Sequence, residues 1–346
     1  MRASKRIVTW VIVSLILQCS VYFYLNNFYF SPEGNIKFTK MNTFDKKNTI
    51  KPNVTFLSSD ENISLSDNFA YTASLTDGIV KVMDTSTGEK RKISFGNGVK
   101  CLAYKWVPDT NRMIIAEELY NSRGRKVIKF FYYDAEKQEK AEIYNYENKV
   151  ENSMPVGERV DFQISELTGV LYAKITYSKV LASIYRLDRN ETLKRESTVT
   201  RNIGNISVAA NNDQLLYEDL AYGGIHSNYT PRSTVRLNKG SSVSLLGSDD
   251  DDNFYLGLGK SRINKIYYGK LTENTSQWKE ISLNTPADIN NIIISPDNNV
   301  YVVDREQGNI LNVKNNKTTN FKGTFIELNN NSIISKVDNK LTIKSF

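Results

Sequence analysis

Apolar and polar residues alternate along most of the chain beyond residue 53, in short runs that polar turns separate. Residues 298–313, NNVYVVDREQGNILNV, show one such unit: an alternating run, an acidic turn and a second alternating run. Alternation with a period of two predicts β-strands that bury one face, and a polar turn between two such runs predicts a hairpin. The 20 Tyr and 15 Phe residues, with only 7 Pro, suit pleated strands better than long helices.

This hairpin unit recurs along the chain. We recognise copies at residues 79–95, 126–144, 182–197, 233–246, 264–281, 308–321 and 339–346. Most copies follow a further alternating strand, at residues 68–75, 112–119, 169–177, 213–222, 253–259, 299–304 and 332–338. A short apolar stretch precedes several of these strands, and four strands in sequence order form one blade of a β-propeller. About 41 residues per copy lies within the range of known blade repeats, which predicts about seven four-stranded blades; six or eight blades also fit.

The last copy supplies only three strands before the chain ends, at residues 323–329, 332–338 and 339–346. An open three-stranded edge would invite pairing with other chains. We therefore expect residues 53–59, NVTFLSS, to provide the missing strand. The N- and C-terminal strands would then share one blade and latch an all-β propeller that spans residues 53–346.

Residues 7–25 form an apolar run of 19 residues without charge. As a helix, such a run is long enough to cross about 28 Å of hydrocarbon. Arg2, Lys5 and Arg6 precede it, and the positive-inside bias places the N-terminus in the cytoplasm and the remainder outside. The run therefore predicts a single-pass signal anchor in the cell membrane.

The predicted domains follow from this anchor: a cytoplasmic tail at residues 1–6, the transmembrane segment at 7–25, a stalk or linker at 26–52 and an extracytoplasmic propeller at 53–346. Two alternatives involve processing of the same run. A cleaved signal peptide needs small residues before the cut, and lipidation of Cys19 needs a small residue in place of Gln18. Neither requirement is met, so the uncleaved anchor is favoured.

The net charge of +7 does not indicate a nucleic-acid partner. Three of the 45 Lys and Arg residues precede the apolar run, which leaves 42 basic residues against 38 acidic residues. No basic stripe is interleaved with aromatic residues, as nucleic-acid recognition requires. The two cysteines cannot form a disulfide framework, because Cys19 lies in the apolar run and Cys101 lies in a strand-like segment, where we expect it to be a core residue.

Two segments resemble known propeller repeats. Residues 295–313, SPDNNVYVVDREQGNILNV, are similar to the NHL- or YVTN-type repeat, and residues 82–90, VMDTSTGEK, resemble the Asp-x-x-Thr-Gly turn of related bacterial propellers. The chain also resembles the propeller half of dipeptidyl-peptidase-type proteins, without their hydrolase domain. The resemblance implies a propeller that acts as a scaffold or binds ligands or proteins, with occasional hydrolase or lyase chemistry. It carries over no functional residue.

The sequence shows no catalytic apparatus. His226 is the only histidine, so a multi-His metal site is excluded and a Ser-His-Asp site would have to be built around this residue. No G-x-S-x-G elbow is present, and seven blades leave no residues for a hydrolase domain. Residues 257–261, GLGKS, fail as a phosphate loop, because Phe254 stands where the first glycine is required. We predict neither an enzyme nor a cofactor.

An acidic run at Asp249, Asp250, Asp251 and Asp252 is a weak candidate for a hard cation such as calcium. It lacks the alternate-residue ligand spacing and the Glu of a calcium loop. Asp-rich turns between strands are common, so the run is interpreted as a turn between the first and second strands of its blade. That position places it on the face opposite the expected ligand entrance.

Two long connections between second and third strands are expected on the entrance face. Residues 119–126 present Arg123 and Arg125, and residues 221–234 present aromatic, His and Arg side chains. Long loops with aromatic residues and Arg are typical of recognition surfaces. The predicted binding residues are Tyr222, His226, Tyr229, Arg232, Arg123 and Arg125.

The predicted function is therefore a non-enzymatic interaction module for an envelope protein, a peptide or a glycan. Three alternatives remain open. The loops are equally typical of insertion-tolerant surface. A propeller lyase or hydrolase would instead use carboxylates and Tyr in the central channel. A structural spacer would show neither an aromatic patch nor converging carboxylates.

Overall fold

The computed structural model describes residues 10, 13–15, 17–22, 50–145, 152–179, 181–229, 233–237, 242–329 and 331–346. The chain divides into two compact units, Met1–Thr49 and Ile50–Phe346. Most of the cytoplasmic tail, anchor and stalk predicted at residues 1–52 lies outside the described residues. Residues 10, 13–15 and 17–22 are helical. Among the residues described, no helix is both long and apolar enough to cross a membrane.

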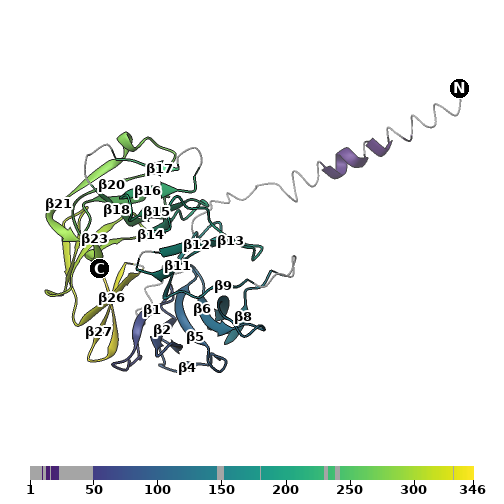
Figure 1. The fold of residues 1–346 in the computed structure, drawn as a ribbon, viewed down its shortest axis with the longest axis horizontal. Coiled ribbons are helices and arrows are strands. Elements are labelled where there is room, and N and C mark those ends of the chain that lie inside the picture. The colour runs from purple at the N-terminus through teal and green to yellow at the C-terminus, as the bar shows by residue number, and fades with distance from the viewer. Residues whose placement is uncertain are drawn as a thin grey trace. The chain divides into compact units, whose positions relative to one another are not determined.

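The second unit is an all-β propeller with seven blades, which confirms the predicted fold and blade count (Figure 1). Blade one comprises β1 (Glu61–Leu65), β2 (Tyr71–Thr76), β3 (Ile79–Asp84) and β4 (Lys90–Arg91). Blade two comprises β5 (Lys100–Trp106), β6 (Arg112–Tyr120), β7 (Lys126–Asp134) and β8 (Glu139–Glu142), with β9 (Met154–Pro155) paired to β7. Blade three comprises β10 (Arg159–Ile164), β11 (Leu171–Ser178), β12 (Leu181–Leu187) and β13 (Leu193–Arg195).

The remaining blades repeat this order. Blade four comprises β14 (Ile203–Val208), β15 (Leu215–Asp219), β16 (Gly224–Ser227) and β17 (Thr234–Val235). Blade five comprises β18 (Val243–Ser248), β19 (Phe254–Leu258), β20 (Arg262–Gly269) and β21 (Lys279–Asp288), with 3-10 helices η2 (Thr275–Gln277) and η3 (Ile289–Asn291) beside β21. Blade six comprises β22 (Ile292–Ile294), β23 (Val300–Asp304), β24 (Asn309–Asn312) and β25 (Lys317–Asn320). Blade seven contains β26 (Thr324–Asn329), β27 (Ser332–Val337) and β28 (Lys340–Ser345).

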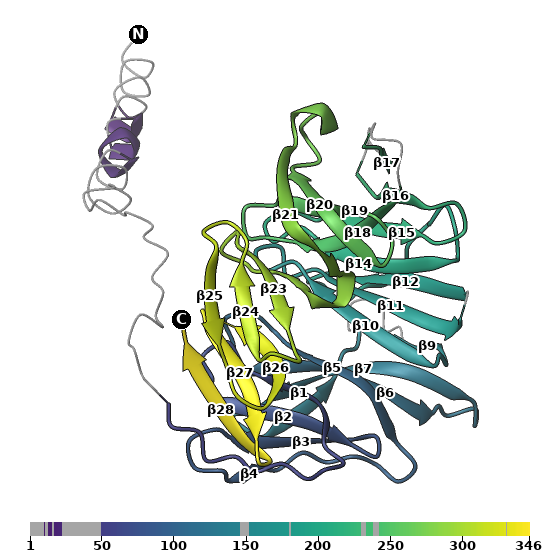
Figure 2. The ribbon, with the colours of Figure 1, turned by 90° about the vertical axis from the view of Figure 1, so that its left-hand side faces the viewer.

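The missing strand of blade seven comes from the start of the propeller, as predicted. Thr55 forms an antiparallel bridge with Lys340, and the N–H of Phe56 donates to the carbonyl of Asn339 at 2.8 Å. Val54 completes the pairing by accepting from the N–H of Leu341. Figures 1 and 2 show the yellow strands of blade seven beside the purple-to-blue strands of blade one. The pairing is shorter than the predicted 53–59, because the chain turns at residues 57–60.

The strand order defines two faces. Successive strands of a blade are antiparallel, so the connections from second to third strands, and from each blade to the next, lie on one face. We call this the entrance face. The connections from first to second and from third to fourth strands lie on the opposite face.

The predicted hairpin at residues 233–246 is wrong. Residues 234–235 form β17, the outermost strand of blade four, whereas residues 243–248 form β18, the innermost strand of blade five. The third strand of blade four is β16, which lies inside the segment 221–234 that the sequence pattern marked as a long loop. The other predicted loop is also shorter than expected, because only residues 121–125 separate β6 from β7.

Apolar side chains fill the space between neighbouring blades. Between blades two and three, the rings of Phe130 and Phe162 pack edge to face with centroids 5.2 Å apart. Cys101 is buried in the cluster between blades one and two, as expected of a core residue. A cluster of buried apolar residues lies at every junction of the ring, so each blade packs against both of its neighbours.

Ionisable side chains connect neighbouring blades at five consecutive junctions of the ring, and we call these connections ties. In each tie, a carboxylate or an ammonium group bonds to a backbone N–H or carbonyl of the next blade, over distances between 2.6 and 3.1 Å. Such bonds satisfy charged groups that would otherwise be costly to bury. The ties join Glu327 to Leu65, Asp67 to Asp109, Lys105 to Phe162, Lys174 to Gly204 and Glu218 to Leu245.

Candidate ligand-binding site

A tight turn at the end of β15 shapes the candidate site. One carboxylate oxygen of Asp219 accepts hydrogen bonds from the backbone N–H groups of Ala221, at 2.9 Å, and Tyr222, at 3.3 Å. The carbonyl of Asp219 accepts from the N–H of Gly223 at 2.8 Å. Gly223 has φ of 74°, in the left-handed region that glycine adopts without strain. This turn reverses the chain into β16 and lifts Tyr222 into solvent.

The same Asp-x-x-x-Gly turn occurs twice more. Asp84 binds the N–H groups of Ser86 and Thr87 ahead of Gly88, and Asp304 binds those of Glu306 and Gln307 ahead of Gly308. Those two turns lie within the segments whose propeller resemblance is visible in the sequence. The letters DLAYG at 219–223 have the same spacing. This spacing is the signal that would have revealed β16.

His226 lies in β16 between two polar neighbours. Its Nε2 is 3.6 Å from Oδ2 of Asp219, and its Nδ1 is 3.3 Å from the hydroxyl of Thr234 on β17. The imidazole also lies against the ring of Tyr217 on β15, with centroids 5.6 Å apart. The Asp219 side chain is almost fully buried, and that of His226 is only slightly exposed. Asp219, His226 and Thr234 therefore form a continuous polar wall.

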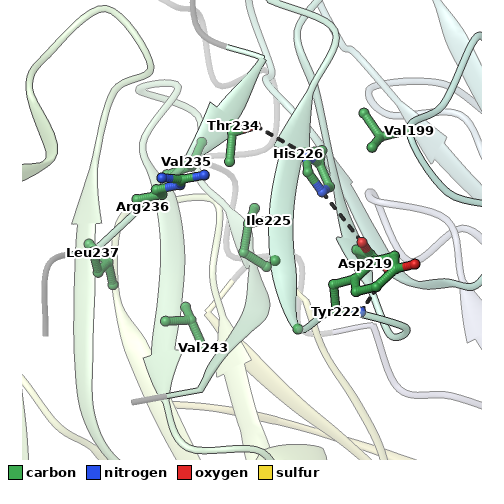
Figure 3. A pocket seen from close by; sticks show the side chains of 12 residues that line it. Val199, Asp219, Tyr222, Ile225, His226, Thr234, Val235, Arg236, Leu237 and Val243 are labelled. Atoms are coloured by element: carbon green, nitrogen blue, oxygen red, sulfur yellow. Dashed lines mark hydrogen bonds and ion pairs between the residues drawn. The ribbon is translucent and has the colours of Figure 1, made fainter. Parts of the chain in front are cut away.

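This wall lines a hollow of about 580 Å³ at the outer edge of blade four, which we call the His226 hollow (Figure 3). Asp219, His226 and Thr234 form its polar side, and an apolar side lies opposite them. The volume falls within the range of about 300–1,000 Å³ typical of small-ligand sites. The other lining side chains are Val199, Tyr222, Ile225, Val235, Arg236, Leu237 and Val243, and the backbone of Gly223 and Gly224 completes the lining.

The structure brings together two of the predicted binding residues and separates others. Tyr222 and His226 both line the hollow. Tyr229 does not line it, and its partly buried side chain packs on the apolar cluster between blades four and five. Arg232 lies outside the described residues. Asp219, Thr234 and Arg236 line the hollow but were not predicted, because their roles depend on the turn at Asp219 and on the pairing of β16 with β17.

Arg123 and Arg125 lie on blade two, away from the His226 hollow. Their backbone N–H groups donate to the side-chain oxygen of Asn121, which fixes the turn between β6 and β7. Both side chains are exposed. As predicted, they belong to the entrance face, but they contribute to a different part of it.

The acidic run after β18 is built as a turn, in the position predicted for it. Asp249 accepts hydrogen bonds from the backbone N–H groups of Asp251 and Asn253 and from the hydroxyl of Tyr255. Asp252 accepts at 2.7 Å from the N–H of Asn211 in blade four. The carboxylates of Asp249 and Asp252 are thus engaged in structure. Within the described parts of the chain, no group of three His, Cys, Asp or Glu residues is arranged to hold a metal ion.

Two ionisable groups on innermost strands, Glu327 and Lys105, interact electrostatically with Asp67 in the connection between β1 and β2. Burial raises the pKa of Glu327 to about 8, and the nearby charge of Asp67 acts in the same direction. Burial also lowers the pKa of Lys105 and raises that of Asp67. All three side chains serve as ties between blades, so these perturbed groups have a structural function.

Comparison with known proteins shows the fold alone. The chain is similar in structure to the β-propeller domain of Cps50 (Swd1) from Myceliophteria thermophila, with a TM-score of 0.53 and 10% sequence identity, over 85% of this chain and 99% of that chain. No family model matches the sequence, and no curated protein matches it. The resemblance to NHL- and YVTN-type repeats is therefore supported as far as the propeller fold, without assignment to a family.

Proposed function

We propose that this protein is a non-enzymatic binding module that takes a peptide or glycan segment of an envelope component in the His226 hollow. The observation that carries the proposal is the composition of the hollow: a polar side of Asp219, His226 and Thr234 opposite an apolar side. A concave site of this kind fixes a ligand by a few polar contacts and binds it by apolar burial. Tyr222 and Arg236 on the rim are residue types enriched at recognition sites.

Catalysis is the alternative function for the same residues, because the carboxylate of Asp219, the imidazole of His226 and the hydroxyl of Thr234 follow one another as in a catalytic triad. A nucleophile and its base usually approach within about 2.6–3.2 Å, whereas the two contacts of His226 measure 3.6 and 3.3 Å. The alternative of a carboxylate site in the central channel is also less favoured, because Glu327 and Asp67 bond to the backbone of neighbouring blades. Both considerations favour binding over chemistry.

Crosslinking in the native cell tests this function. A photo-crosslinking amino acid at position 222 should give discrete adducts with one envelope component. The same amino acid at position 167, on the opposite face, is the matched control, because Leu167 is also well exposed. Combining the crosslinker at 222 with His226→Ala and Arg236→Glu should remove the adducts. Adducts that persist in that variant, or that form equally from position 167, would contradict the hollow as the binding site.

For localisation, we propose that residues 7–25 anchor the chain in the cell membrane with the propeller outside. The uncharged run of 19 residues and the basic residues before it support this orientation. Protease added to intact protoplasts should then digest the propeller and spare a cytoplasmic tag fused to Met1. Protection of the propeller until the cells are lysed would overturn the proposed orientation.

A further inference from the structure

The large apolar side chains that the propeller exposes are concentrated on one face. Among its described residues nine such side chains are exposed, and seven of them lie at connections of the entrance face. The two exceptions are Leu167, in a connection of the opposite face, and Phe346, at the C-terminus, which stacks on Tyr301. The seven are Leu57, Ile79, Tyr120, Leu181, Val199, Leu220 and Tyr222.

These side chains occupy six connections around blades one to four, because Leu220 and Tyr222 share one turn. Ile79, Tyr120 and Leu181 lie at the turns between second and third strands of blades one, two and three. Tyr222, at the corresponding turn of blade four, is 91% exposed. They therefore project singly from a row of turn tips and do not form one continuous groove. A partner with a fluid apolar interior can receive each tip separately.

Basic residues accompany the apolar tips in blades two to four. Arg123 and Arg125 follow Tyr120, Lys179 precedes Leu181, and Arg201 follows Val199. All four basic side chains are exposed. Basic residues beside exposed Tyr and Leu are the pattern of proteins that bind anionic bilayers, because the cations remain at the headgroups while the apolar groups enter the interface.

The opposite face carries the reverse charge. Its connections between first and second strands contain nine acidic residues and no Lys or Arg, whereas the connections between second and third strands contain five basic and three acidic residues. The acidic residues of the first set are Asp67, Asp109, Glu166, Asp213, Asp249, Asp250, Asp251, Asp252 and Asp297. The second set contains Arg123, Arg125, Lys179, Lys260, Arg305, Asp77, Glu306 and Asp338. Over all connections, the sequence of the entrance face contains eleven basic and eight acidic residues, and that of the opposite face contains five basic and fourteen acidic residues. An anionic surface would therefore favour the entrance face and repel the other.

We propose that the entrance face of blades one to four docks on the surface of an anionic lipid bilayer. The tips at Tyr120, Leu181 and Tyr222 enter the interfacial region, and Arg123, Arg125 and Lys179 contact the phosphate groups. The acidic opposite face points away from the bilayer. The His226 hollow lies at the outer edge of this face and shares only Tyr222 with these docking residues, so docking is tested separately at positions 120 and 181.

Depth-dependent fluorescence quenching on the full chain tests the docking. Single cysteines replace Tyr120, Leu181 or, as the control on the opposite face, Leu167, in a Cys19→Ser background, and each is labelled with an environment-sensitive fluorophore. The protein is reconstituted in phosphatidylcholine vesicles with or without phosphatidylglycerol, and quenching by brominated lipids is measured. We expect quenching at positions 120 and 181 that requires phosphatidylglycerol, and none at 167.

Charge variants complete the test. Each of Arg123→Gln, Arg125→Gln and Lys179→Gln should reduce the equilibrium constant for docking about fivefold, which is the effect of about 1 kcal/mol per basic group near an anionic surface. His226→Ala should leave quenching unchanged and affect only ligand capture, which separates the two proposals. Equal quenching at 167, quenching independent of phosphatidylglycerol, or no quenching would overturn the docking. Self-association through this face without quenching would also overturn it and would identify a second copy as the partner.

Discussion

The backbone of Thr55 pairs with that of Lys340, so the start of the propeller forms the outer strand of its last blade. Side chains alternate along this short strand. Val54 and Phe56 are buried in the cluster between blades seven and one, whereas Thr55 faces solvent. The strand therefore closes the ring by hydrogen bonds and also by packing.

Truncation of Phe56, a buried side chain of this strand, should destabilise the whole propeller. Phe56→Ala is expected to lower the free energy of unfolding by about 3–5 kcal/mol, because it leaves a cavity at the ring closure. Thr55→Ala, which keeps the strand and changes an exposed side chain, should cost less than about 0.5 kcal/mol. Urea unfolding followed by tryptophan fluorescence measures both. Similar stabilities for the two variants would show that the ring does not depend on the latch.

Stability should depend on pH through Glu327. Its carboxylate accepts from the N–H of Leu65 at 2.8 Å, and burial raises its pKa from 4.5 to about 8. Because the pKa is higher in the folded state, folding favours the protonated form. The associated stability is complete below the unfolded pKa and is lost as the pH rises from about 5 to about 8. Relative to Glu327→Gln, the unchanged protein should lose about 2–4 kcal/mol over this range.

Chemical unfolding at a series of pH values provides the measurement. Glu327→Gln keeps an oxygen that accepts from Leu65 but cannot ionise, so its stability should change less with pH. Glu139→Gln on β8 removes an exposed carboxylate and serves as the control. The expectation fails if the Glu327 and Glu139 variants show the same dependence on pH as the unchanged chain.

The fold could be predicted from the sequence because blades are local units. Each blade lies within one stretch of chain, and its second and third strands alternate over five to nine residues in most blades. The third strands of blades four and six, β16 and β24, have only four residues each, and β16 also lies inside a segment whose pattern indicates a loop. The outer strands β4 and β17 have two residues each, which is too few to show any period.

The candidate site could be predicted only in part for the same reason. The sequence predicts Tyr222 and His226 from their residue types alone. Asp219 and Thr234 join them only when β15, β16 and β17 pair side by side. The tie between Glu327 and Leu65 spans 262 residues of sequence, so it exists only once the ring is closed. A pattern of neighbouring residues in the sequence cannot predict contacts between residues so far apart.

Cys101 should be chemically inert in the native protein. Its side chain is buried, and burial, with a smaller effect of the Glu117 charge, raises the pKa of the thiol to about 12. Since the thiolate is the reactive form, iodoacetamide should modify Cys101 only after unfolding. A cysteine placed at exposed Leu167 is the control and should react in the native protein. Mass spectrometry of tryptic peptides distinguishes the two sites, and native labelling of Cys101 would contradict its place in the core.

The turn that presents Tyr222 should depend on the left-handed conformation of Gly223. No heavy atom lies within 4 Å of a Cβ added at this position, so a substitution meets only the conformational cost of its positive φ. Gly223→Ala should therefore destabilise the protein by about 1 kcal/mol, whereas Gly223→Asn, which tolerates this conformation better, should cost less. Both variants add a side chain at the rim of the His226 hollow, so both introduce a steric effect on binding. The difference in stability between the two variants therefore measures the conformational cost at position 223. Thermal unfolding and crosslinking from position 222 measure the two effects, and an alanine variant as stable as the asparagine variant would show that the turn adopts another conformation.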